Sequence, residues 1–154
     1  MIGILIITHG DLAKALLESA QNIAGEPLPF KTLTIGWNRQ FEDIRREVGE
    51  AIDAVDCGDG VLVLTDLLGG TPSNVALSFV RKRPNIEVVT GVNLPILVKL
   101  ATHQNRNDAT VRDIARSLVD KGVNSIHLLS EYDRKQRSKP QSGKPMRSKP
   151  HGGA

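Results

Sequence analysis

Two apolar runs, each followed by a chemically active side chain, constrain the fold of this chain most. The first run, residues 2–7, is rich in β-branched residues and is followed by His9. The second run, residues 61–64, is followed by Asp66. Runs of this length and composition are typical of buried strands in a parallel sheet. His9 and Asp66 are therefore predicted at the carboxyl ends of two strands, where α/β sheets bind their ligands.

Strand-like and helix-like segments alternate along most of the chain. Besides the first run, strands are predicted at residues 30–35, 60–65, 86–90 and 125–129. Helices are predicted from Asp11 to residue 24, from Asn38 or Arg39 to residue 55, over 71–82 and 94–102, and from Asn107 or Asp108 to residue 121. This alternation predicts an α/β fold, with a doubly wound, mostly parallel five-stranded sheet and helices on both faces. We expect the strand order 2-1-3-4, which opens a crevice between His9 and Asp66.

Length and composition fit a single domain. The chain has 154 residues, of which 40% are hydrophobic, and no apolar stretch approaches the ~20 residues of a membrane span. The N-terminus lacks the basic start of a signal peptide. The single cysteine, Cys57, rules out an internal disulfide and fits a reducing compartment. We therefore expect a cytoplasmic protein.

Basic residues are concentrated at the C-terminal end. Seven of the 20 Lys and Arg residues follow Asp133, whereas all 17 Asp and Glu residues lie at or before it, so residues 1–133 carry 13 basic side chains against 17 acidic ones. An acidic body with only 3% aromatic residues does not favour nucleic-acid binding. The end of the chain is rich in Lys, Arg, Ser, Pro and Gly. We therefore predict a domain over residues 1–130 and a disordered basic tail over 131–154.

The segment after Asp66 has the features of an anion-binding site. Gly70 follows another glycine in a turn, and Thr71 is the expected N-cap of the next helix. The N–H groups around Gly70, Thr71 and Ser73 are predicted to bind phosphoryl oxygens at this helix N-terminus. The hydroxyls of Thr71, Ser73 and Thr8 are candidates for the same role.

A histidine held by a carboxylate is suited to phosphoryl transfer. When Asp66 accepts a hydrogen bond from one ring N–H of His9, the other ring nitrogen is left as the nucleophile. Phosphoryl transfer needs little beyond positioning and charge stabilisation. The sequence contains no Walker motif, GxGxxG or metal-ligand cluster, so no cofactor or metal is expected. Trp37 and Asn93, which follow the second and fourth predicted strands, are candidates for lining the site or for packing.

Three motifs in order resemble those of a known family. They are THG at residues 8–10, DLLGGTPSN at 66–74 and GVNLP at 91–95. Together they are similar to the enzyme IIA domain of the mannose family of the bacterial sugar phosphotransferase system, over about residues 1–130. The resemblance implies that His9 is phosphorylated by the phosphocarrier protein HPr and passes the phosphoryl group to a IIB domain, with Asp66 bonded to His9. It also implies that the protein acts indirectly on IIC and IID permease subunits. It further implies a homodimer in which a short last strand crosses to the partner and runs antiparallel.

Other interpretations stay open from the residues alone. A regulatory protein would use the same phosphorylation to change partner binding instead of transporting a sugar. A phosphoryl donor for dihydroxyacetone kinase shares this domain type, but the motif at residues 66–74 fits the mannose type better. A histidine phosphatase also has a His-Gly pair after its first strand, but Thr8 stands where that class has an arginine.

Overall fold

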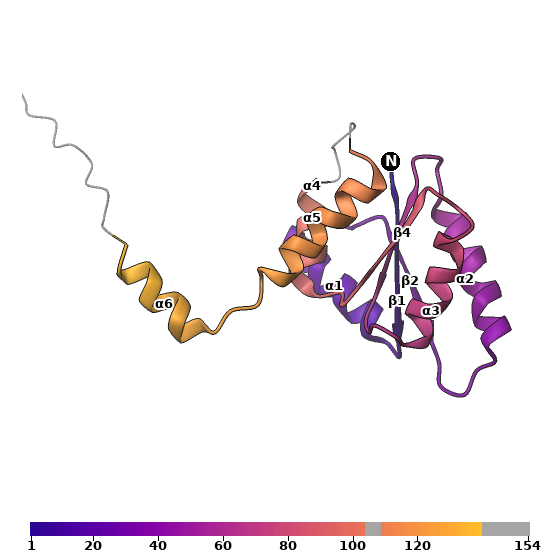
Figure 1. Ribbon diagram of the computed structural model, residues 1–154, viewed down its shortest axis with the longest axis horizontal. Helices are drawn as coiled ribbons and strands as arrows, with labels where there is room; N and C mark the ends of the chain where they lie inside the picture. Colours follow the sequence, from indigo (N-terminus) through magenta and orange to yellow (C-terminus); the bar gives the residue numbers. More distant parts are fainter. Residues whose placement is uncertain (104–108, 140–154) are drawn as a thin grey trace, which may run out of the picture.

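A parallel sheet of four strands forms the centre of the molecule (Figure 1). The computed structural model describes residues 1–103 and 109–139. The order is β2-β1-β3-β4, as the sequence predicts. The strands are β1 (Gly3–His9), β2 (Phe30–Ile35), β3 (Val61–Thr65) and β4 (Ile86–Thr90).

Helices cover both faces of the sheet, which confirms that part of the prediction. Within the described residues they are α1 (Leu12–Ala24), α2 (Phe41–Val55), α3 (Thr71–Val80), α4 (Leu94–His103), α5 (Val111–Val123) and α6 (Leu129–Arg137). Helices α1, α4 and α5 lie on one face and α2 and α3 on the other (Figure 1).

Alternate residues of β1 face the two layers of the core. Ile4 and Ile6 pack in the cluster with α1, α4 and α5, whereas Leu5 and Ile7 pack in the cluster with α2 and α3. Burial on both faces explains why the strand is apolar at successive positions. Each such side chain contributes about 1.5–3 kcal/mol of burial free energy, so the strand that carries His9 is firmly held.

The helix starts differ in part from those predicted. The Asp11 side chain makes no cap hydrogen bond at α1; Thr8 Oγ1 accepts from the Ala13 N–H instead, at 2.8 Å. Helix α5 begins after Thr110, whose side chain forms a capping box with Asp113. The predicted caps at residues 107 and 108 lie outside the described residues.

The predicted fifth strand over residues 125–129 is wrong for the single chain. Residues 126–128 form no strand, and Leu129 begins α6. This segment pairs with no strand of the described sheet, and an isolated strand is not stable without a partner. The four-stranded sheet therefore ends at β4.

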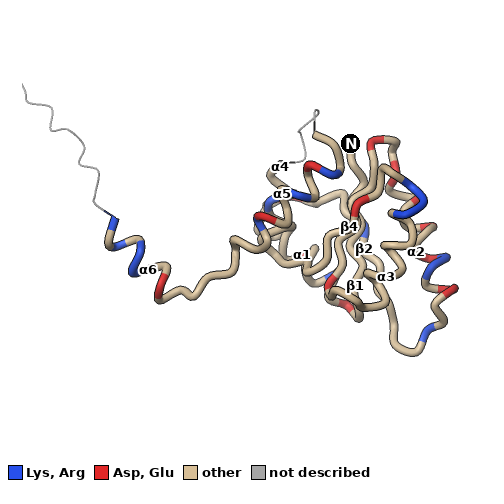
Figure 2. The backbone as a smooth tube through the Cα atoms, viewed as in Figure 1, with Lys and Arg blue, Asp and Glu red and all other residues tan. Residues whose placement is uncertain are grey.

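The prediction of a disordered tail from residue 131 is corrected for residues 131–137, which belong to α6. Glu131 lies in its first turn, Arg134, Lys135 and Arg137 in its last, and Asp133 pairs with Arg137 at 3.0 Å. These charges match the helix dipole and the i,i+4 spacing. Figure 2 shows this charged helix standing away from the body. The remaining predicted tail, residues 140–154, is outside the described residues. None of the described helices has the length and apolar character needed to cross a membrane.

Candidate functional site

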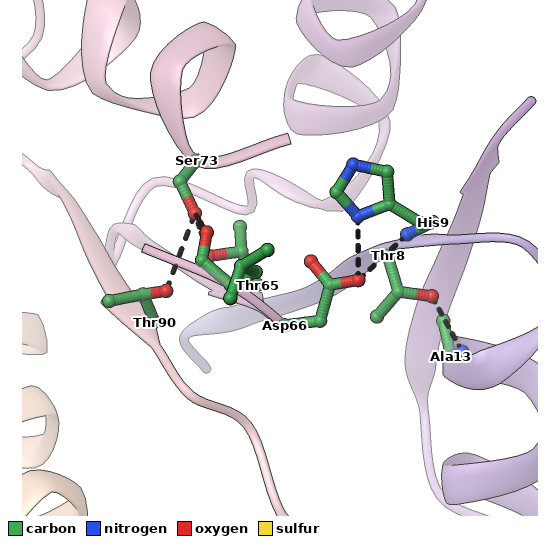
Figure 3. Close-up of polar contacts among 8 residues, drawn as sticks. Thr8, His9, Ala13, Thr65, Asp66, Ser73 and Thr90 are labelled. Atoms are coloured by element: carbon green, nitrogen blue, oxygen red, sulfur yellow. Dashed lines mark hydrogen bonds and ion pairs between the residues drawn. The ribbon is translucent and has the colours of Figure 1, made fainter. Parts of the chain in front are cut away.

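His9 and Asp66 meet at the carboxyl edge of the sheet because β1 and β3 are neighbours. The register pairs Ile7 with Thr65, so both strands end at the same level. Asp66 Oδ2 lies 2.9 Å from His9 Nδ1 and accepts the His9 backbone N–H at 2.9 Å (Figure 3). One carboxylate oxygen therefore fixes both the main chain and the ring of His9.

This contact selects one tautomer of the imidazole. An ionised carboxylate can only accept hydrogen bonds, so Nδ1 carries the proton and donates it to Asp66. Nε2 then keeps its lone pair. The His9 side chain is 25% exposed and the Asp66 side chain 14%, so the imidazole ring is more accessible than the carboxylate that holds it.

The ionised form of Asp66 is favoured by His9. Burial raises the pKa of the Asp66 carboxyl, but the hydrogen bonds from the His9 backbone and ring and the charge of His9 outweigh burial, so the pKa lies below its ordinary value. Asp66 Oδ1 is buried and accepts no hydrogen bond from the described residues. The negative charge of Asp66 is therefore compensated mainly by the hydrogen bonds from His9.

This pKa shift predicts a contribution to stability that depends on pH. Because the folded pKa is depressed, the contribution is present above the unfolded value of about 3.9 and is lost as the pH falls through the folded pKa. The Asp66→Asn protein should therefore be less stable than the native protein at neutral pH, and this difference should shrink in acid. Urea unfolding at a series of pH values measures it. Asp11→Asn, which changes an exposed carboxylate, is the control, and a gap that stays constant down to the acid range would contradict the expectation.

The N-terminus of α3 contacts the imidazole through Gly70. Gly70 is the N-cap residue, and a Cβ atom at this position would lie 2.9 Å from His9 Cε1 and 3.6 Å from His9 Nε2. A side chain here would therefore displace the ring. The first-turn N–H groups of Thr71 and Ser73 have no acceptor within the helix, so α3 presents free donors and its positive dipole end beside Nε2.

Gly70→Ala should damage the site while leaving the fold intact. The Gly70 backbone, with φ of −74°, suits any residue, so the strain falls mainly on His9, with a smaller part on the Leu67 carbonyl oxygen at 3.3 Å. We expect phosphoryl uptake to slow by about tenfold to 10²-fold, as for other small misplacements of reacting groups, with little change in melting temperature. Gly49→Ala in α2 is the matched control, because a Cβ there also meets a ring, that of Phe79 at 3.2 Å, but lies against no residue of the site. Equal uptake rates for the two variants would refute this role of Gly70.

Three predicted site side chains are used for structure instead. Thr8 is fully buried and caps α1. The Ser73 hydroxyl, also buried, donates to the Leu67 carbonyl at 2.6 Å and lies 2.6 Å from Thr65 Oγ1 (Figure 3). Asn93 Oδ1 accepts the Ile96 N–H at 3.1 Å and so caps α4. These three side chains are therefore engaged in hydrogen bonds within the fold, whereas the Ser73 N–H has no acceptor within its helix.

Trp37 lies on the imidazole, and a pair of exposed leucines follows Asp66. The rings of His9 and Trp37 are stacked with centroids 5.6 Å apart. Leu67 and Leu68 are 60% and 80% exposed, and the sequence analysis did not single them out. The sequence feature that could have identified them is an apolar pair within a glycine-containing turn, because exposed apolar pairs often mark a surface that binds a partner.

Known proteins share this arrangement of elements. The family described as "PTS system fructose IIA component", where PTS denotes the phosphotransferase system, matches residues 3–118. This chain belongs to that family. A fructose-specific EIIA component of Bacillus subtilis is 30% identical over 132 residues, covering 86% of this chain and 89% of that protein. A mannose-specific EIIAB component of Escherichia coli is 29% identical, covering 83% of this chain but 39% of that longer protein.

Solved EIIA structures agree with this membership. A phosphotransferase system component EIIA from Streptococcus agalactiae has a TM-score of 0.75 at 27% identity, and the match covers 85% of this chain and 99% of that one. A mannose/sorbose-specific IIA subunit from Enterococcus faecalis has a TM-score of 0.71 at 27% identity, covering 82% and 94%. The chain is thus an EIIA component of the mannose type and a transferase component of sugar transport. The family match includes β1, β3 and the start of α3 and ends before α6.

Proposed function

We propose that this EIIA component is a phosphohistidine carrier that accepts a phosphoryl group from phospho-HPr on His9 and passes it to a IIB domain. The observation that carries the proposal is the contact between Asp66 and Nδ1 of His9, at 2.9 Å. It leaves Nε2 as the nucleophile beside the N-terminus of α3. Family membership supports the general phosphocarrier role.

The transfer can be written from these residues. The Nε2 lone pair of His9 forms a bond to phosphorus as the bond between phosphorus and the HPr nitrogen breaks, and that electron pair stays with HPr. Nδ1 keeps its proton, so the phosphorylated ring is positive and is stabilised by Asp66. The N–H groups of Thr71 and Ser73, with the Thr71 hydroxyl, bind the phosphoryl oxygens. Transfer to IIB repeats the step with His9 as the leaving group.

The direct test is phosphorylation in a defined mixture. The purified protein is incubated with phosphoenolpyruvate, enzyme I and HPr, and its intact mass is followed over time. We expect one phosphoryl group per chain, and no uptake when HPr is omitted. NMR of the ¹⁵N-labelled histidine should place the phosphorus on Nε2. Phosphorus on Nδ1, or no uptake at all, would refute the proposal.

Transfer onward distinguishes a transport component from a purely regulatory one. The relatives are named for different sugars, fructose, mannose and sorbose, so we propose no single sugar. Addition of purified IIB domains from such systems to the phosphorylated protein should release the phosphoryl group to IIB. A phosphoprotein that donates to none of them would contradict the carrier role.

We further propose that the working form is a homodimer. Within the described residues β4 pairs only with β3, so one edge of the sheet carries unpaired backbone groups. The segment that leaves α5 exposes apolar side chains: Val123, Ile126, Leu128 and Leu129 are 67%, 79%, 65% and 73% exposed. Side chains of this kind are normally buried at an interface.

Removal of this segment should therefore yield monomers. A chain that ends at Asn124 loses three of the four exposed apolar residues but keeps α5, whose Gly122 is buried. Analytical ultracentrifugation should show a monomer for this protein and a dimer for a chain that ends at Lys139. A stable dimer of the shorter chain would show that the interface lies elsewhere.

A further inference from the structure

We infer that Trp37 is a positioning residue for His9. The Trp37 indole holds the imidazole ring and stabilises its positive, phosphorylated form. This inference rests on the proposed phosphorylation of His9. Trp37 is the only tryptophan of the chain. It is not one of the groups that would bind the phosphoryl oxygens, so its role is separate from those of Asp66 and Gly70.

The two rings lie face to face. Their centroids are 5.6 Å apart and their planes differ by 22°, which is the offset-stacked range for aromatic pairs. Asp66 holds the imidazole at Nδ1 and Gly70 lies against Cε1. The hydrogen bond from Asp66 is at the edge of the ring, and Trp37 supplies a contact with its flat face.

The loop between β2 and α2 is built to keep Trp37 in this place. The parallel register sets Ile35 beside His9, so the loop leaves β2 next to the site. Asn38, directly after Trp37, is the only non-glycine residue with positive φ in the described part of the chain, at 59°. This is a conformation that asparagine tolerates better than most residues.

An ion pair anchors the other end of the loop. The Arg39 guanidinium donates two hydrogen bonds to the Glu47 carboxylate of α2, at 2.8 and 2.5 Å. The bond to Arg39 holds the pKa of Glu47 below its ordinary value. A bidentate pair fixes direction as well as distance. The indole is therefore held over His9 although 76% of its surface is exposed.

An indole face attracts a cation more strongly than it attracts a neutral ring. The phosphorylated ring is positive because Nδ1 keeps its proton, and it becomes neutral when the electron pair of the Nε2–P bond returns to Nε2. Trp37 therefore stabilises the phosphorylated state relative to the state after phosphoryl loss. For an exposed pair the effect corresponds to about a two- to fivefold slower loss of the phosphoryl group.

The test uses the full chain and two substitutions at one position. Trp37→Leu removes the aromatic face but keeps an apolar side chain, and Trp37→Phe restores a smaller face. Phe41→Leu is the control, since Phe41 is exposed at the start of α2 and has no ring contact with His9 among the described residues. Each protein is phosphorylated, separated from HPr, and followed by intact mass as the phosphoryl group is lost to water.

We expect Trp37→Leu to lose the phosphoryl group about two- to fivefold faster than the native protein, with Trp37→Phe in between and Phe41→Leu unchanged. NMR of the unphosphorylated protein should show the ring protons of His9 shifted by the indole current, and this shift should vanish in Trp37→Leu. Equal lifetimes of the phosphoryl group on the native and Trp37→Leu proteins would overturn the inference. A Trp37→Leu protein with an altered KM for HPr but an unchanged phosphoryl lifetime would also overturn it. If native His9 is not phosphorylated at all, the proposed function itself fails, which is a distinct result.

Discussion

The His9→Ala protein should take up no phosphoryl group from phospho-HPr. Among the histidine side chains that the structure describes, His9 alone has an ionised carboxylate on Nδ1 and a helix N-terminus beside Nε2. Without the imidazole there is no nucleophile at this edge, and transfer should fall to the limit of detection. Intact mass after incubation with phosphoenolpyruvate, enzyme I and HPr measures this loss.

His103→Ala is the matched control for this experiment. His103 is the last residue of α4, a helix that begins just after β4 at the carboxyl edge of the sheet and leads away from it, so its removal should leave uptake unchanged. The adduct of the native protein should be acid-labile, as expected of a phosphorus–nitrogen bond. A stable adduct on the His9→Ala protein, or loss of uptake in His103→Ala, would place the phosphorylated residue elsewhere.

Asp66→Asn should fold and yet transfer phosphoryl groups on the order of 10²–10⁴-fold more slowly, as for other tautomer-fixing aspartates. The amide has nearly the same shape, but it has no charge to stabilise a positive ring. It can also donate to Nδ1, which would put the proton on Nε2, the atom that must attack. Rapid-quench measurement of phosphoryl uptake gives the rate.

The control for this variant is Asp11→Asn, which alters a carboxylate that is 82% exposed in its side chain and pairs only with Lys14 at 3.4 Å among the described residues. Its rate should match that of the native protein. An Asp66→Asn protein that transfers at the native rate would mean that the contact to His9 is structural and contributes nothing to transfer.

The central pair could be predicted from the sequence because it depends on strand ends alone. Two neighbouring parallel strands that finish at the same level bring the residues after them together, whatever the loops do. The strand order and the helices on both faces followed from the alternation of apolar periods. For these features local pattern and tertiary structure agree.

Side-chain roles around the pair were harder to predict, because a hydroxyl can bind a ligand or a backbone group equally well. The Thr8 hydroxyl accepts an N–H of the first turn of α1, and the Ser73 hydroxyl donates to the Leu67 carbonyl. The sequence does not show which way these hydroxyls point. The strand prediction for the C-terminal segment was wrong for a different reason. Residues 125–129 alternate in a strand-like way, but they pair with no strand of the described sheet.

Because His9 and Asp66 are attached to strand ends, the residues on the surrounding loops can change in evolution independently of this pair. Both reacting groups are fixed by the sheet, whereas Leu67, Leu68 and Trp37 lie on the loops around them and are largely exposed. Substitutions at Leu67 and Leu68 can change the exposed surface around the site without moving the strand ends that hold Nε2 and the carboxylate. A shared chemical step can in this way be kept while relatives diverge in the transport systems they serve.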